Sequence, residues 1–171
     1  MSEISREIDF VKDRDLQKIA NCMFIVLMLV AWLVRMDLFM VYSILTIPAI
    51  VVVVPLHEAL HGLLFKLWTG KVKFGFVMAS SFPAFYATSE GSRLPRNKFI
   101  ALCLIPQTIT LVCMLLAAFG DFSNFLTGSL LACASFNLAG GFSDIYIAGA
   151  LLTSSSKVVV EDLLTGVVIY G

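Results

Sequence analysis

The sequence predicts an all-α polytopic membrane protein with four transmembrane helices and a small β-hairpin in the loop between helices two and three. Of its 171 residues, 59% are hydrophobic and 14% are charged, and the mean hydropathy is +0.93. A soluble domain has nearer half apolar and a quarter charged residues. Four apolar runs approach or exceed the roughly 20 residues that a helix needs to cross a bilayer. The formal net charge is zero, so nothing indicates a nucleic-acid partner.

The apolar runs divide the chain, expected to be a single membrane domain over 1–171, into spans and connections. The spans are expected at about 19–34, 41–68, 99–119 and 125–152. Basic residues concentrate in the segment 1–18 and in the loop 70–98. Because such residues favour the cytoplasmic side, both segments and the tail 153–171 are expected there, which places both termini inside. The expected location is the cytoplasmic membrane of a bacterium, with the lipid bilayer as a partner.

The central loop contains two extended-looking pieces. Lys71–Phe76 alternates polar or small residues with apolar ones, and Phe82–Thr88 is a second such piece, with Ala79–Ser81 as a turn. This pattern predicts a β-hairpin at the membrane face, although an irregular aromatic loop is an alternative. A free hairpin edge would offer a place to hold an extended peptide. The tail, with Val158–Val160 and Val167–Ile169, is expected to add a strand to this hairpin or to pack at the interface.

The two histidines of the chain stand four residues apart in the run His57-Glu58-Ala59-Leu60-His61. This is an H-E-x-x-H pattern inside the second predicted span. On a helix, residues i and i+4 share a face, so both imidazoles can reach one metal ion. Glu58 points elsewhere on the helix and suits a general base that acts on water at the metal. The pattern predicts a metal site some 15–18 Å from the cytoplasmic end of this helix.

A catalytic zinc site usually has three protein ligands, so a third one is needed. Asp144 is the one acid deep in an apolar span other than Glu58, and an ionisable group there is a candidate functional residue. Its depth is about 12 Å, close to that of the histidines. The alternatives are that the histidines form hydrogen bonds to neighbouring helices and that Asp144 serves helix packing or a proton relay.

Asn137 lies two helical turns before Asp144 and on the same face. It is a candidate substrate-binding residue, and an interhelical hydrogen bond is the alternative. Cys22, Cys103, Cys113 and Cys133 all lie in apolar runs without C-x-x-C spacing, so we expect small buried side chains rather than metal ligands.

The motifs together resemble a known family. They are the run His57–Lys66, the segments Lys73–Phe76 and Tyr86–Thr88, and Asn137 with Ser143-Asp144. These resemble bacterial putative-zincin integral membrane proteins of unknown function, which are similar to the site-2 protease class of intramembrane zinc metalloproteases. The resemblance covers about 40–170. It implies zinc held by His57, His61 and Asp144, with Glu58 as the catalytic base.

The function expected from these observations is that of a zinc-dependent intramembrane endopeptidase. It would cleave a membrane-embedded or juxtamembrane peptide bond by metal-activated water, with a membrane protein or peptide as substrate. Two alternatives belong to other classes. One is a non-proteolytic membrane scaffold that keeps the metal site, and the other is a small metal or proton transporter that uses His57, His61 and Asp144 as a relay.

Overall fold

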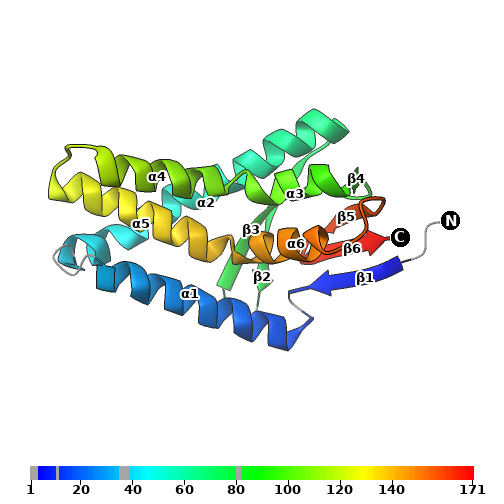
Figure 1. Cartoon of the computed structure of the whole chain (residues 1–171), viewed down its shortest axis with the longest axis horizontal. Helices are drawn as coiled ribbons and strands as arrows, with labels where there is room; N and C mark the ends of the chain where they lie inside the picture. The colour runs from blue at the N-terminus through cyan, green and yellow to red at the C-terminus, as the bar shows by residue number, and fades with distance from the viewer. Residues whose placement is uncertain (1–3, 11, 35–38, 80–81) are drawn as a thin grey trace.

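The computed structural model describes residues 4–10, 12–34, 39–79 and 82–171. The long helices run roughly along one axis, and a β-sheet lies at the end of the molecule where both termini are found (Figure 1). The helices are α1 (Arg14–Val34), α2 (Phe39–Thr69), α3 (Arg96–Leu104), α4 (Gln107–Phe119), α5 (Asn124–Gly140) and α6 (Phe142–Leu152). The strands are β1 (Ile4–Asp9), β2 (Lys73–Ala79), β3 (Phe82–Thr88), β4 (Arg93–Pro95), β5 (Val159–Leu163) and β6 (Gly166–Tyr170).

The expected all-α class is wrong, because the chain combines helices with two β-sheets. The number of candidate membrane spans is also lower than the four expected. In the described part of the chain, two segments are long and apolar enough to cross a membrane, namely Ile47–Thr69 and Arg96–Phe119. A third is available if α5 and α6, which meet at an angle of 51°, count as one broken span. These apolar helices indicate membrane association.

Breaks in the apolar segments follow from single residues. Pro106 has no backbone N–H to donate, and α3 ends at Leu104 before α4 begins at Gln107. Gly141 separates α5 from α6, where the sequence places two successive glycines. A Cβ atom on Gly141 would lie 2.2 Å from Gln107 Nε2 and 3.1 Å from His57 Cε1. The absence of a side chain at Gly141 therefore lets this segment approach Gln107 of α4 and His57 of α2 closely.

The predicted hairpin is present as β2 and β3, which pair antiparallel from Lys73–Thr88 to Ala79–Phe82. Its predicted turn includes residues 80–81, which lie outside the described residues. The hairpin packs on α2, because Gly62 leaves room for the ring of Phe74; a Cβ atom there would lie 2.2 Å from Phe74 Cζ. The glycine directly after the second histidine thus positions the hairpin beside the motif.

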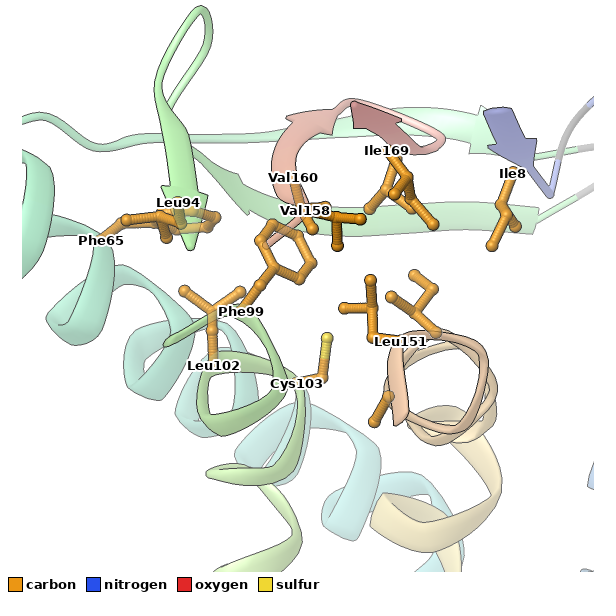
Figure 2. Packing of buried hydrophobic residues seen from close by; sticks show 13 residues of the cluster. Ile8, Phe65, Leu94, Phe99, Leu102, Cys103, Leu151, Val158, Val160 and Ile169 are labelled. Carbon is orange, nitrogen blue, oxygen red and sulfur yellow. The ribbon is translucent and has the colours of Figure 1, made fainter. Parts of the chain in front are cut away.

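The tail does not join this hairpin, contrary to one expectation. It forms a hairpin of its own, β5–β6, in an antiparallel sheet of order β1-β6-β5-β4. One face of this sheet packs on α3 and α6, and the side chains of Val160, Ile169 and Ile8 point toward Phe99 and Leu151 (Figure 2). Val160 and Leu151 have no exposed surface. This buried cluster fixes the sheet against the helices that carry the polar site.

A glycine is required at position 166, where β6 pairs with β1. A Cβ atom there would lie 1.9 Å from the carbonyl oxygen of Ile8 and 2.8 Å from Asp9 Cα. Because these are backbone atoms, Gly166→Ala should displace β1 and destabilise the protein by about 1–3 kcal/mol. Thermal unfolding in detergent measures this, with Gly149→Ala as the control, since a Cβ atom at that helical position meets nothing within 4 Å. Equal stability of the two variants would contradict the prediction.

Candidate metal centre

Three side chains from two helical segments converge in the described structure. His57 and His61 lie one turn apart on α2, and Asp144 lies in the first turn of α6. His57 Nε2 is 3.0 Å from Asp144 Oδ2, and His61 Nε2 is 3.3 Å from the same oxygen. The two Nε2 atoms are 3.2 Å apart. The structure thus brings together the residues that the sequence predicted as ligands.

The hydrogen bonds of Asn137 determine which nitrogen of His57 faces this cluster. The Asn137 amide nitrogen donates to the carbonyl oxygen of Pro106 at 2.9 Å and to Thr110 Oγ1 at 2.9 Å. Its Oδ1 atom therefore faces His57 Nδ1 at 3.1 Å and accepts the proton of that nitrogen. His57 Nε2 is then left with a lone pair directed at His61 and Asp144.

A divalent cation fits this arrangement. Zinc with bond lengths of about 2.0–2.1 Å and tetrahedral angles separates its ligand atoms by roughly 3.3 Å. The observed separations of 3.0, 3.2 and 3.3 Å are close to that value. The three side chains are only 9–17% exposed. Two imidazoles and one carboxylate are a common ligand set for catalytic zinc.

Asn137 is 1% exposed, and its amide contacts three partners, His57, Pro106 and Thr110. The interhelical hydrogen bond, which was the alternative to a substrate contact, is therefore observed, and it holds His57 in its orientation. A substrate contact of Asn137 stays a prediction. Cys103 lines the neighbouring cavity, but its sulfur is not part of the cluster of ligand atoms.

Removing the Asn137 amide should weaken metal binding without removing a ligand. We expect Asn137→Ala to lower zinc affinity about 10- to 100-fold, because partners that orient a ligating histidine typically contribute this much. Competition with a fluorescent zinc chelator measures the affinity. Thr110→Val, which removes another partner of the same amide without touching His57, is the control and should have a smaller effect. A wild-type affinity in Asn137→Ala would contradict the prediction.

A cavity of about 270 Å³ opens beside the cluster. Its walls come from α2, β3, α3, α6 and the β5–β6 hairpin, and Phe10 after β1 also contributes. Glu58 lies in this wall, and the backbone N–H of Ala87 in β3 donates to its carboxylate. The base candidate is thus beside the ligand cluster and next to the strand that a peptide would meet.

Asp162 in β5 also lines the cavity, and sequence reasoning missed it. In the sequence Asp162 lies in the tail, outside the apolar runs. The sequence feature that could have identified Asp162 is the alternation of side chains along a strand. Val158 and Val160 are both buried, and Asp162 lies on the same face two residues later. Strand β1, more than 150 residues before β5 in sequence, pairs with β6 and completes the sheet that contains this face.

Burial raises the pKa of Asp162 to about 7, against the opposing effects of the Thr88 hydroxyl and His61, while Asp144 and Glu58 raise it further. The folded protein therefore retains a proton that the unfolded chain releases near pH 4, so the free energy of unfolding falls as pH rises from about 4 to 7. The slope from this group is at most about 1.4 kcal/mol per pH unit.

We accordingly expect Asp162→Asn to gain stability relative to the wild type as pH rises from 5 to 8. Thermal unfolding of the two proteins in detergent, with a chelator present throughout, measures the difference in melting temperature. A difference that stays constant across this range would contradict the raised pKa.

Residues 50–159 match the protein family described as "Putative zincin peptidase". No curated protein and no solved structure matches the chain. The family match and the His57–His61–Asp144 cluster together indicate a zinc peptidase. The similarity to site-2 proteases stays a prediction.

Proposed function

Because the chain belongs to the putative zincin peptidase family, we propose that it is a zinc-dependent endopeptidase that cleaves a peptide bond in or next to a membrane. The observation that carries this proposal is the convergence of His57 Nε2, His61 Nε2 and an Asp144 carboxylate oxygen within 4.8 Å of one another. These three side chains would hold the zinc ion. When bound, zinc would polarise the scissile carbonyl and make a nearby water acidic enough to attack it.

Glu58 is placed to move the protons of this reaction. Its carboxylate lines the same cavity, one residue after His57, and has the Ala87 amide as a partner. As general base, Glu58 takes a proton from the attacking water. It then gives that proton to the leaving nitrogen, so the amine departs neutral. Asn137 keeps His57 in the tautomer and orientation that leave Nε2 free for the metal.

The substrate would bind as an extended strand along β3. A helical peptide shields its carbonyls through internal hydrogen bonds, so a membrane helix must unwind before hydrolysis. Within the described residues, β3 pairs only with β2, and Phe85, Tyr86 and Ala87 line the cavity. The edge of β3 that is not paired with β2 can therefore pair with an unwound peptide and bring its carbonyl toward the cluster.

A location within the membrane is supported by the surface of α2. On this helix Val52, Leu56, Leu63 and Leu67, which flank the histidines in sequence, are 46–71% exposed. In water such a surface would be costly, whereas lipid accepts it. Strand β1 pairs with β6, so both ends of the chain lie at the same end of the molecule (Figure 1). This supports the prediction that both termini face one side, with the basic segments assigning that side to the cytoplasm.

Hydrolysis of membrane peptides tests the proposal. Full-length, zinc-loaded protein is reconstituted in liposomes with a panel of single-span membrane proteins, and products are identified by mass spectrometry. We expect at least one substrate to be cut within or beside its span, with no cut by the Glu58→Gln variant. Absence of cleavage across the panel in a zinc-loaded, folded protein, or zinc flux across the liposomes, would favour the scaffold or transporter instead.

A further inference from the structure

Asp162 is a cavity-lining carboxylate that the proposed reaction does not use. It projects from β5 on the side of the cavity formed by the β5–β6 hairpin, whereas the ligand cluster comes from α2 and α6. Val160, two residues earlier on the same face, has no exposed surface. The strand thus directs a third carboxylate, beside those of Glu58 and Asp144, toward the space where a substrate would lie.

The cavity lining is rich in carboxyl groups. Its lining includes the carboxylates of Glu58, Asp144 and Asp162, and no lysine or arginine is among the described residues that line it. Three carboxylates carry −3 when ionised, and a divalent ion would leave −1. A cationic group that enters the cavity would offset this remaining charge.

The neighbouring acid, Glu161, shows by contrast what a paired carboxylate looks like in this strand. Its Oε2 atom is 3.1 Å from Arg93 Nε and accepts a hydrogen bond of 2.8 Å from the Tyr170 hydroxyl. These partners lie outside the cavity lining. In the described part of the chain no ion pair joins a lysine or arginine to Asp162. The strand thus carries two adjacent acids, one paired with Arg93 on the outer face and one directed into the cavity beside the Thr88 hydroxyl.

We propose that Asp162 selects substrates that carry a cationic group, an ammonium or guanidinium, next to the scissile bond. This inference rests on the proposed function. The cation is the side chain of a lysine or arginine, or the free amino end of a peptide. Leu163, Leu164 and Phe10 line the cavity near this acid and suit the aliphatic stem of such a group. The raised pKa of Asp162 fits this role, because a cation would favour the ionised form that burial disfavours.

Binding of peptide hydroxamates, which chelate zinc, tests the selection without relying on turnover. A lysine compound and its norleucine match share the same four-carbon stem and differ in the terminal ammonium group of lysine. Two further norleucine compounds, one with a free and one with an acetylated amino end, separate the two sources of the cation. Affinities for zinc-loaded, full-length protein in detergent are measured by calorimetry at pH 8. We expect the lysine or the free-amine compound to bind about tenfold more tightly than its neutral match, as one charge-assisted hydrogen bond would give.

Two variants assign this preference to Asp162. Asp162→Asn should abolish it while the neutral compound binds within about twofold of wild type. Glu161→Gln removes the same charge from the adjacent position and should keep the preference. Equal wild-type affinities for every charged and neutral pair would overturn the inference, whether or not the variants fold. A preference that persists in Asp162→Asn would also overturn it. Failure of all hydroxamates to bind would instead reject the zinc site, and with it the proposed function and this inference.

Discussion

Replacing Glu58 with glutamine is expected to reduce peptide hydrolysis at least about a hundredfold while zinc remains bound. General acid–base catalysis contributes about 10²–10⁴-fold to a rate, and this carboxylate is the one placed to accept the proton of the attacking water. Glutamine has nearly the same shape and retains an oxygen that can accept from the Ala87 amide. The fold and the ligand atoms should therefore be preserved. The measurement is the initial rate of cleavage of a verified substrate, alongside zinc content.

The control for this prediction is Glu161→Gln, which makes the same chemical change outside the cavity lining. Its rate should equal that of the wild type, because the change lies away from the reacting atoms. Full activity in Glu58→Gln would remove the base from the mechanism. Loss of zinc together with activity would instead make Glu58 a structural member of the metal site.

Removing Asp144 should have the largest effect on metal binding. Asp144 supplies the one anionic ligand atom of the cluster, and its Oδ2 lies within 3.3 Å of both histidine nitrogens. We expect Asp144→Ala to weaken zinc binding by more than about a hundredfold, beyond what loss of a partner behind a ligand costs. His61→Ala should have a comparable effect. Competition with a chelator of known affinity provides the measurement.

Asp121→Ala is the matched control, because Asp121 is an exposed acid in the connection between α4 and α5. Its zinc affinity should equal that of the wild type. If Asp144→Ala binds zinc as tightly as the wild type, the third ligand lies elsewhere, and Asp144 would belong to helix packing or a proton relay. If Asp144→Ala and the control Asp121→Ala lose zinc equally, the loss reflects a disturbed fold and not the removal of a ligand.

The sequence was informative where the information is local. The apolar runs predicted 41–68 and 125–152, and helices α2 and α5–α6 occupy Phe39–Thr69 and Asn124–Leu152. The alternating pattern predicted the β2–β3 hairpin, whose two strands are only two residues apart. In both cases the residues that determine the structure are neighbours along the chain, so periodicity and composition suffice.

The four-stranded sheet was missed because its pairing is not local. Strand β1 lies in a segment of mixed charges, and Ile8 pairs with Val167 at the other end of the chain. No short-range pattern specifies such a partner. Asp162 belongs to the same sheet. The sequence alone shows it only as a residue of the tail, and the pairing of the strands brings it to the cavity. By contrast, the i, i+4 spacing of His57 and His61 corresponds to one helical turn, and the isolation of Asp144 among apolar residues indicated it as a candidate third ligand.

We propose that His57, His61 and Asp144 together bind one zinc ion. X-ray absorption spectroscopy on the zinc-loaded, detergent-purified protein tests it most directly, because the spectrum reports the number and type of ligand atoms. We expect one zinc per chain with two imidazole nitrogens and one carboxylate oxygen at about 2.0–2.2 Å, and an additional light-atom ligand. Sulfur at about 2.3 Å, or a shell without imidazole, would contradict it, as would a folded protein that binds no zinc.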